Sequence, residues 1–464
     1  MKQLHEVIEV AQPIEDVFRY TANFGNIEQW DPGVSESQKS TPGPIGVGTR
    51  FRVAVKAGIS STPMDYEIKR YEPPNRVVLE GRGGRIHAID DIRFSKTNSG
   101  TRVDYTADIS LGGAAGLIEP LLGGVLESVG RKALAGLQEA LAADPQPPAE
   151  SAARNLLDRF VLPGALGFTR FGYQCKKRTW RAMPASLEGR TAIVTGATSG
   201  LGRIVAEKLA GLGARVVLVG RNTQKLEQAM REISEETGNE NIHSELADLG
   251  LMSEVRKLAG NLLEREESIH ILVNNAAVLP NERTLTEEQL ETTFATDLLS
   301  PYLLTRLLLP RLKQSAPSRI INVLSGGMYM SGIDVDDLEY ANGDFDGSRA
   351  YARAKRGLMI LTEHWATEMA DSGVVVNAMH PGWADTPGVQ DSLPGFHRLT
   401  RSILRTPEQG ADTIVWLAAA AEAGKVSGKF WLDREPHLSA ILPGTAGDKA
   451  LREQLFGELK RLAA

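Results

Sequence analysis

A tyrosine and a lysine, Tyr351 and Lys355, stand four positions apart in a stretch that is predicted to be helical. Residues at this spacing lie on one face of a helix, so their side chains can act together. Tyrosine has a pKa of about 10 and is a poor acid–base group at neutral pH, but a nearby ammonium favours the phenolate and lowers that pKa. Ser325 follows an apolar strand and can hydrogen-bond a substrate oxygen. These three side chains predict proton transfer to or from an oxygen atom.

A glycine-rich loop lies between the first strand and the first helix of the same region. In chain order it reads Thr195, Gly196, Ala197, Thr198, Ser199, Gly200, Leu201 and Gly202. Glycines allow a tight turn and let backbone N–H groups approach a phosphate, and the following helix N-terminus adds a favourable dipole. We therefore predict that this loop binds the pyrophosphate of a dinucleotide.

The end of the next strand bears on the choice of dinucleotide. Folds that select NAD place a carboxylate there to bind the ribose hydroxyls. Here Val219 is followed by Gly220 and Arg221, with no carboxylate. Because an arginine can pair with a 2′-phosphate, the sequence predicts NADP(H) rather than NAD(H), although a solvated arginine would look the same.

Alternating strands and helices must position these groups. Beyond residue 190 a helix is expected at Leu201–Leu212, and strands are expected at Thr191–Thr195, Arg215–Val219, Ile269–Val273, Ile320–Leu324 and Val374–Ala378. Strands that alternate with helices form a parallel sheet covered on both faces. Since the crossovers are right-handed, we predict an α/β fold with a doubly wound Rossmann sheet over residues 188–464.

Taken in order along the chain, these motifs resemble the short-chain dehydrogenase/reductase (SDR) family. The spacing Thr-Gly-three residues-Gly-any residue-Gly in the loop is that of the family, and residues 325–328, 381–388 and 427–430 most resemble the subgroup that includes SDR family member 12. The resemblance implies further cofactor contacts from three segments along the chain. They involve Asp248 and Leu249 at the adenine, Asn275 and Ala276 beside the cofactor, and Pro381, Gly382 and Thr386 at the nicotinamide end.

The chemistry that this resemblance implies is hydride transfer at an apolar carbonyl or alcohol. Hydride adds to the carbonyl carbon while Tyr351 protonates the oxygen, Ser325 holds that oxygen, and Lys355 also holds the cofactor ribose. One position departs from the family, because Asp297 stands where an asparagine usually holds a proton-relay water. A carboxylate can still accept a hydrogen bond from water, but its charge could pair with Lys355 and reduce the effect of the lysine on Tyr351.

The first 145 residues are predicted to form strands separated by turn residues and closed by a long helix. Strands are expected at Gln3–Val10, Arg50–Ala57, Met64–Tyr71, Arg76–Glu80, Ile86–Phe94 and Thr101–Ile109, and the closing helix carries Leu117, Leu121, Val125 and Val129. Residues 13–18 and 30–32 resemble the START/polyketide-cyclase-like superfamily. That resemblance implies an α+β helix-grip fold over residues 1–145, with a sheet around the long helix and a cavity for a lipid-like or polycyclic ligand. The same apolar residues could instead fill an ordinary core.

Residues 146–187 begin with a proline-rich linker and continue as a segment in which apolar and basic residues are mixed. Such a segment over residues 154–181 could touch an anionic membrane surface. The favoured interpretation is a helical arm that packs on one of the two domains or on a second subunit. A homo-oligomer therefore remains open.

Composition limits the classes of function. The 464 residues exceed one ordinary domain, and 42% hydrophobic and 24% charged residues are typical of a globular protein. A net charge of −6 gives no reason to expect a nucleic-acid partner. Cys175 is the only cysteine, so no cysteine metal cluster is expected and no metal site is predicted. With neither a signal-peptide pattern nor a long apolar run, we expect a cytoplasmic protein.

Two alternatives to a hydrophobic-substrate reductase stay open. The chain could be a carrier of lipid-like ligands whose SDR domain only senses NADP(H), and the departure at Asp297 leaves room for this. The N-terminal domain could also be a cyclase or dehydratase. His5, Asp65 and His87 are polar candidates there, but no spacing singles out an acid–base pair.

Overall fold

The computed structural model describes residues 2–57, 60–84, 86–111, 123–141, 146–150, 155–156, 158, 165–180, 183 and 185–463. The chain divides into two compact units. The first comprises residues 1–145, 180–186 and 235–238, and the second comprises residues 146–179, 187–234 and 239–464. Each unit is described by itself below.

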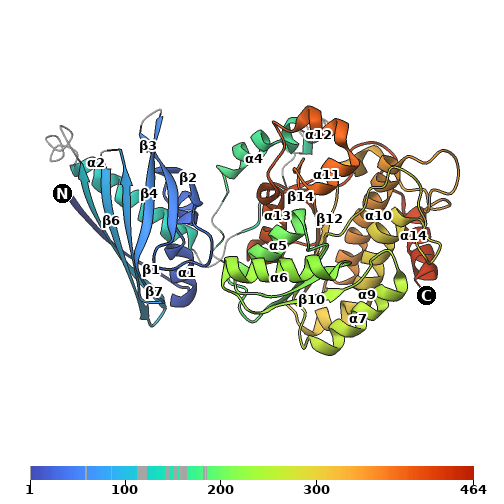
Figure 1. Ribbon diagram of the computed structural model, residues 1–464, viewed down its shortest axis with the longest axis horizontal. Helices are drawn as coiled ribbons and strands as arrows, with labels where there is room; N and C mark the ends of the chain where they lie inside the picture. The colour runs from blue at the N-terminus through green and yellow to red at the C-terminus, as the bar shows by residue number, and fades with distance from the viewer. Residues whose placement is uncertain are drawn as a thin grey trace. The chain divides into compact units, whose positions relative to one another are not determined.

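The N-terminal unit contains one seven-stranded antiparallel sheet in the order β1-β7-β6-β5-β4-β3-β2. Its strands are β1 (Lys2–Val10), β2 (Val34–Lys39), β3 (Arg50–Ala57), β4 (Ser60–Glu72), β5 (Arg76–Gly83), β6 (Ile86–Thr97) and β7 (Gly100–Leu111). Its helices are α1 (Ile14–Ala22), the 3-10 helix η1 (Phe24–Gln29) and the long α2 (Gly123–Ala140), which Figure 1 shows beside the sheet. This is the α+β architecture expected for a helix-grip fold.

Helix α2 packs closely on the first strand and on the segment after η1. A Cβ on Gly136 would lie 2.0 Å from the carbonyl oxygen of Trp30, and one on Gly130 would lie 3.2 Å from Leu4. Glycine has a low helix propensity, and close packing therefore explains why α2 is stable although it contains several glycines. Leu117 and Leu121, which the sequence places in the same helix, lie outside the described residues.

The second unit is the predicted doubly wound α/β fold. Its eight-stranded sheet has the order β10-β9-β8-β11-β12-β13-β14-β15, and it is parallel except for the antiparallel pair β14 and β15. The strands are β8 (Thr191–Thr195), β9 (Arg215–Gly220), β10 (Ile242–Leu246), β11 (Ile271–Asn274), β12 (Ser318–Val323), β13 (Val374–Met379), β14 (Phe430–Leu432) and β15 (Glu435–His437).

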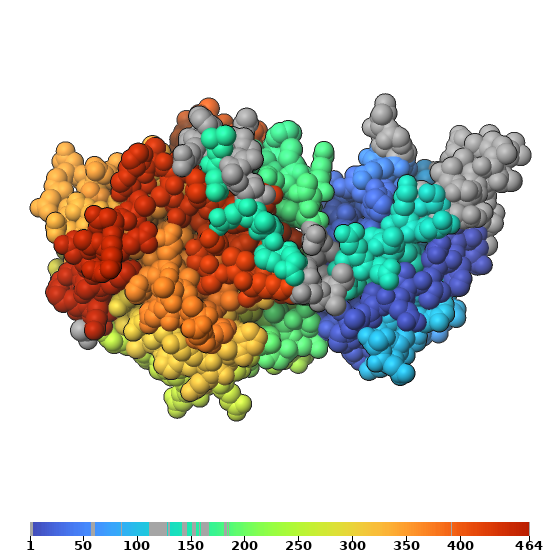
Figure 2. Space-filling model, turned by 180° about the vertical axis from the view of Figure 1, so that it is seen from behind, coloured from blue at the N-terminus to red at the C-terminus, as the bar shows by residue number. Residues whose placement is uncertain are grey.

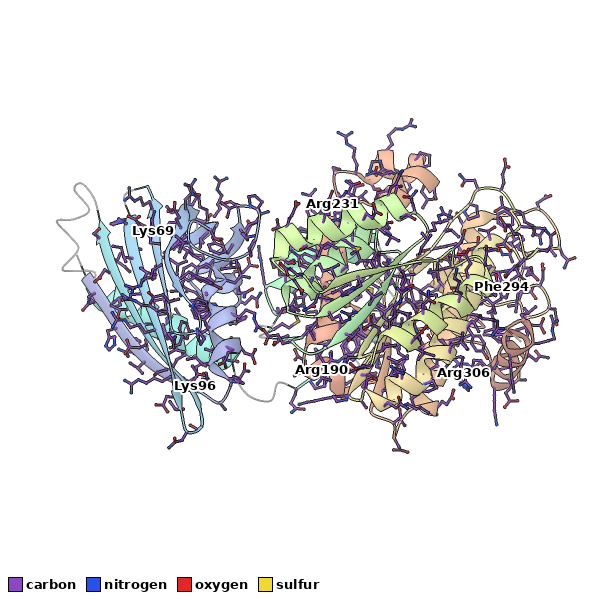
Figure 3. All side chains as sticks on the ribbon, turned by 60° about the horizontal axis from the view of Figure 1, so that its bottom comes forward. Lys69, Lys96, Arg190, Arg231, Phe294 and Arg306 are labelled. Carbon is purple, nitrogen blue, oxygen red and sulfur yellow. The ribbon has the colours of Figure 1, made fainter. Side chains whose placement is uncertain are left out.

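Helices cover both faces of this sheet. Figure 1 shows the sheet between one group, α5 (Gly200–Gly211), α6 (Thr223–Thr237) and α13 (Pro407–Ala419), and another, α7 (Met252–Arg265), α9 (Ser300–Gln314) and α10 (Gly347–Glu368). Phe294, labelled in Figure 3, ends the short helix α8 (Thr292–Phe294) and is part of the buried core. The core also contains fully buried aliphatic residues of the central strands, such as Ile193, Leu272 and Ile320. It fixes the strand ends on which the site is built.

The arm belongs to the second unit up to Thr179, whereas Trp180–Ser186 belong to the first. In the second unit its described helices are the 3-10 helix η4 (Ala165–Phe168) and α4 (Arg170–Lys177), which Thr169 caps by accepting a hydrogen bond from the Gly172 N–H at 3.4 Å. Figure 2 shows the arm (turquoise) over C-terminal residues (red), and Lys176 forms an ion pair of 2.6 Å with Glu435. Across the described residues, no helix is both long enough and apolar enough to cross a membrane.

Candidate active site

A cavity of about 1100 Å³ lies in the second unit, and segments that follow strands β8, β9, β11, β12 and β13 contribute to its wall. In a doubly wound sheet this is the edge where ligands bind. The predicted site residues that line it are Gly196, Thr198, Ser199, Gly200, Leu201, Arg221, Asp248, Leu249, Asn275, Ala276, Ser325, Tyr351, Lys355, Pro381, Gly382 and Thr386. Three further predicted residues do not line the cavity but contact residues that do: Thr195, Gly202 and Asp297.

The glycines of the 195–202 loop are required by its backbone. Gly196 and Gly200 have φ angles of 65° and 54°, a left-handed region that favours glycine. A Cβ on Gly202 would lie 2.3 Å from the carbonyl oxygen of Gly196, so only glycine lets α5 start this close to the loop. The loop therefore brings its backbone and the N-terminus of α5 to the cavity wall, as the pyrophosphate of a dinucleotide requires.

Thr195 and Asn275 tie this loop to the end of β11. The Thr195 hydroxyl oxygen accepts hydrogen bonds from the N–H groups of Asn275 and Ala276, at 2.9 and 3.0 Å. The Asn275 amide donates in turn to the Thr195 carbonyl oxygen at 2.8 Å. These residues therefore shape the site beside the expected cofactor.

The end of β9 presents positive charge to the cavity. Arg221 is exposed at the rim, and Lys225, which the sequence analysis did not single out, lines the same cavity. Asp248 also lines the cavity, and its Oδ1 accepts a hydrogen bond from the Gly250 N–H at 2.8 Å. Arg221 and Lys225 thus place two basic side chains on this part of the cavity wall.

Tyr351, Lys355 and Asp297 form a buried group at the inner end of the cavity. The Lys355 ammonium lies 5.3 Å from the centre of the Tyr351 ring and 3.2 Å from Asp297 Oδ2. Asp297 belongs to a π-helical turn (Ala295–Leu299) that runs into α9, and its Oδ1 accepts a hydrogen bond from the Val278 N–H at 2.9 Å. Such turns inside helices often mark functional sites. The sequence analysis raised the possibility that Asp297 pairs with Lys355, and the structure contains this ion pair.

Ser325 holds the start of the short 3-10 helix that faces Tyr351. Its hydroxyl oxygen accepts a hydrogen bond from the Gly327 N–H at 3.2 Å, which caps residues Gly326–Met330. The Ser325 hydroxyl also acts to lower the pKa of Tyr351. Both residues line the same cavity.

Burial dominates the ionisation of this group. It raises the pKa of Tyr351 above its ordinary value, and the charge of Lys355 opposes this without cancelling it. The sequence-based expectation of a lowered tyrosine pKa also counted the positive charge of an oxidised nicotinamide, so it stays a prediction for the protein with its cofactor bound. Burial also raises the pKa of Asp297 to about 6. Burial acts to lower the pKa of Lys355, but the charge of Asp297 raises it.

Sequence comparison agrees with this geometry. Residues 190–395 match the family described as short chain dehydrogenase. Dehydrogenase/reductase SDR family member 12 of Homo sapiens is 39% identical over 304 residues, which cover 65% of this chain and 95% of that protein. This chain belongs to the short-chain dehydrogenase/reductase family. It therefore contains an oxidoreductase unit of a family that uses NAD(H) or NADP(H).

Other relatives match the same SDR region. Dehydrogenase/reductase SDR family member 12 of Bos taurus is 40% identical over 306 residues, which cover 65% of this chain and 95% of that protein. Retinol dehydrogenase 13 of Homo sapiens is 35% identical over 288 residues, with 60% of this chain and 86% of that protein covered. Residues 1–142 match a second family, described as polyketide cyclase / dehydrase and lipid transport. The N-terminal unit thus carries the superfamily resemblance that the sequence indicated.

The arm adds Phe168 to the wall of the SDR cavity, a contact that sequence reasoning missed. The Phe168 ring meets the His380 ring edge-on at 4.7 Å and lies 6.1 Å from the ring of Trp383. The Trp383 N–H donates a hydrogen bond to the Phe168 carbonyl oxygen at 2.8 Å. All three residues line the cavity next to Pro381. The only sequence signal was the apolar character of the arm.

His380 is a buried polar residue in this wall. Neither ring nitrogen has a hydrogen-bond partner among the described residues. Burial, with the charge of Arg405, lowers the pKa of His380 to about 3, so the imidazole is neutral at physiological pH.

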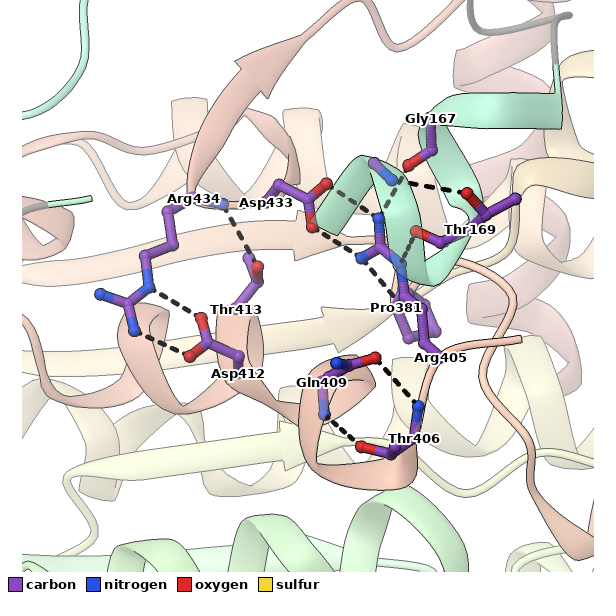
Figure 4. A network of polar contacts seen from close by, with 11 residues as sticks. Gly167, Thr169, Pro381, Arg405, Thr406, Gln409, Asp412, Thr413, Asp433 and Arg434 are labelled. Carbon is purple, nitrogen blue, oxygen red and sulfur yellow. Dashed lines mark hydrogen bonds and ion pairs between the residues drawn. The ribbon is translucent and has the colours of Figure 1, made fainter. Parts of the chain in front are cut away.

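A buried arginine of the SDR unit, Arg405, holds the arm in place (Figure 4). Its guanidinium donates to both carboxylate oxygens of Asp433, at 2.6 and 2.8 Å, and to the carbonyl oxygens of Gly167 and Thr169, at 2.8 and 3.2 Å. Gly382 has a φ of 73°, and a Cβ there would lie 2.3 Å from Arg405 Nε. The Pro381–Gly382 segment therefore also leaves room for the arginine that fixes Phe168.

Proposed function

We propose that this SDR protein is an NADP(H)-dependent oxidoreductase that reduces an apolar carbonyl compound, or oxidises the alcohol, and that its N-terminal unit binds a hydrophobic ligand. The observation that carries the proposal is that Tyr351, Ser325 and the buried Lys355 line one cavity together with the 195–202 loop. We further propose domains at residues 1–145 and 188–464, with residues 146–187 as the linker and arm.

The choice of NADP(H) rests on charge at the end of β9. Arg221 and Lys225 both line the cavity there, and Gly220 takes the place of the carboxylate that would bind ribose hydroxyls. A 2′-phosphate pairs well with an arginine and a lysine. The glycine loop would hold the pyrophosphate, and Asp248 with Leu249 would contact the adenine.

The bound dinucleotide supplies the hydride that the carbonyl carbon accepts. Ser325 hydrogen-bonds the carbonyl oxygen, and the phenol of Tyr351 donates its proton to that oxygen. Lys355 stabilises the phenolate that remains, because its ammonium lies close to the ring. Asp297 is a positioning residue that fixes the Lys355 ammonium through their ion pair.

An apolar substrate suits the rest of the cavity wall. Beyond the polar inner end, large apolar side chains line it, including Phe168, Met330, Trp383, Phe396, Ile441 and Leu442. Such a surface gains free energy by excluding water from an apolar ligand, while the few polar groups fix its orientation.

The test is a titration with NADPH and NADH that follows nicotinamide fluorescence, then turnover assays with apolar ketones, aldehydes and quinones. We expect NADPH to bind more tightly than NADH and Tyr351→Phe to abolish turnover. Tyr302→Phe, on a tyrosine stacked on Trp365 outside the cavity, should keep activity. Cofactor binding without turnover on any compound would favour a ligand carrier that senses NADP(H). No binding of either cofactor would contradict the proposal.

A matched pair of variants tests the cofactor choice. Arg221→Asp should weaken NADPH binding about tenfold or more and leave NADH binding nearly unchanged, because only NADPH carries the 2′-phosphate. Arg231→Asp makes the same change on α6, outside the cavity lining, and serves as the control. Equal losses for NADPH and NADH in Arg221→Asp would reject the assignment.

A further inference from the structure

The inner face of the N-terminal sheet carries a carboxyl group in an apolar setting. Asp90 of β6 is only 5% exposed and points to the same side as the buried Ala88 and Ile92. Its partners on the neighbouring strands are Leu79 of β5 and Ala107 of β7, both buried. Four apolar neighbours, two of them small alanines, therefore surround a group that proteins seldom bury without a partner.

Only one of the two carboxyl oxygens of Asp90 is satisfied. The Tyr105 hydroxyl donates to Asp90 Oδ1 at 2.8 Å. Asp90 Oδ2 has no hydrogen-bond partner among the described residues. A buried acceptor of this kind costs free energy unless a bound molecule or a water satisfies it.

Trp30, which contacts the Tyr105 ring, carries a second buried group that is unsatisfied among the described residues. The Trp30 ring meets the Tyr105 ring edge-on, with centres 6.5 Å apart, and Trp30 is 3% exposed. The Trp30 indole N–H likewise lacks a hydrogen-bond partner in the part of the chain that the structure describes. One unused acceptor and one unused donor thus flank the same tyrosine.

The charges around this group favour a neutral ligand. Burial raises the pKa of Asp90 to about 7, with smaller contributions from Asp31 and Asp108 that act in the same direction. Burial also raises the pKa of Tyr66 and Tyr105, and the charge of Asp90 adds to both effects. Because an ammonium would lose more hydration than a hydroxyl on entering this apolar interior, a hydroxyl fits better than an amine.

We propose that the inner face of the N-terminal sheet binds an apolar molecule that carries an alcohol or phenol hydroxyl, which donates a hydrogen bond to Asp90 Oδ2. The indole N–H of Trp30 donates to an oxygen of the same molecule. The inference deepens the ligand-binding role proposed above for this unit, and it does not depend on the hydride-transfer chemistry of the SDR unit. It assigns Asp90, Tyr105 and Trp30 as the polar groups that select the ligand.

Calorimetric titration of the full chain with matched probes tests this. The probes are 2-naphthol with 2-methoxynaphthalene, and 4-octylphenol with its methyl ether. We expect each phenol to bind about tenfold more tightly than its ether, since only the phenol donates a hydrogen bond to the carboxyl group. Asp90→Asn should remove most of this preference. Tyr105→Phe, which frees Asp90 Oδ1, is a second variant if Asp90→Asn fails to fold.

Two aspartate-to-asparagine controls locate the effect. Asp65→Asn changes an exposed residue of β4 in the same unit, and Asp371→Asn changes an exposed aspartate of the SDR unit. Both should keep the phenol preference. Binding of phenol and ether with equal affinity would overturn this inference and leave the ligand-binding role standing. An unchanged preference in both Asp90→Asn and Tyr105→Phe would also overturn it, and failure of every probe to bind would overturn both proposals.

Discussion

The ion pair of Lys355 with Asp297 modulates the ionisation of Tyr351, which burial dominates. In the SDR family an asparagine usually occupies the position of Asp297, so the carboxylate here adds a negative charge to a buried site. That charge raises the pKa of Tyr351, while the Lys355 ammonium lowers it. The lysine is thus partly neutralised by its partner, and the tyrosine stays protonated to higher pH. This state suits proton donation to a carbonyl oxygen, that is, the reductive direction.

Asp297→Asn should therefore change the pH dependence of the reaction. With the negative charge removed, the pKa of Tyr351 falls, so the rise of the alcohol-oxidation rate with pH should shift to lower pH by about one unit. The variant should also lose about 3 to 5 kcal/mol of unfolding free energy, because Lys355 stays buried without its partner. Steady-state rates between pH 6 and 10, with thermal denaturation in parallel, measure both. A pH–rate profile that superimposes on that of the wild type would contradict the electrostatic role of Asp297.

At the scale of elements, one buried arginine, Arg405, makes several of the contacts that hold the arm. Arg405→Met should release the arm, because the carbonyl oxygens of Gly167 and Thr169 lose their donor and Asp433 is left buried without its partner. The expected cost is about 3 to 5 kcal/mol of unfolding free energy. Limited trypsin digestion should then cut faster within Arg170–Lys177, and the KM for apolar substrates should rise because Phe168 no longer closes the wall.

A double variant separates loss of the arm from an unpaired charge. Arg405→Met with Asp433→Leu removes both buried charges, so most of the stability should return. The arm contacts would still be missing, and fast cleavage with a raised KM should persist. Digestion of Arg405→Met at the wild-type rate would show that other contacts, such as the Lys176–Glu435 pair, suffice to hold the arm.

Elements with a strong pattern were predictable from the sequence, whereas two weakly patterned edge strands, β2 and β10, were not. Strands β8, β9, β12 and β13 were expected within two residues of their observed limits, because each is buried on both faces and reads as an apolar run. Strand β2 has one buried residue, Val34, in an otherwise polar segment, and β10 alternates weakly at the sheet edge. Neither has enough apolar residues to show in a hydropathy pattern.

The residues of the candidate site likewise divide into those that the sequence could predict and those that it could not. Tyr351, Lys355, Ser325 and the glycine loop belong to motifs of fixed spacing, so their meeting at one cavity could be predicted. Phe168 and Arg405 are separated by more than 200 residues in the chain, and nothing in their local sequence indicates that they meet. The pKa of Tyr351 could not be predicted either, because it depends on the depth of burial rather than on residue type.

At the scale of the whole molecule, two cores with separate ligands should unfold as two transitions in scanning calorimetry. NADPH at about 100 times its dissociation constant should stabilise the SDR transition by about 2.7 kcal/mol and leave the N-terminal one unchanged.

The folded pKa of Asp90, about 7, lies above its ordinary 3.8, so its contribution to stability is full below about pH 4 and is lost as pH rises through about 7. The N-terminal transition should therefore weaken between pH 5 and 8, by on the order of 3 kcal/mol. In Asp90→Asn that loss of stability should disappear, while the SDR transition keeps its pH dependence. A single transition that responds both to NADPH and to Asp90→Asn would mean that the two units unfold as one.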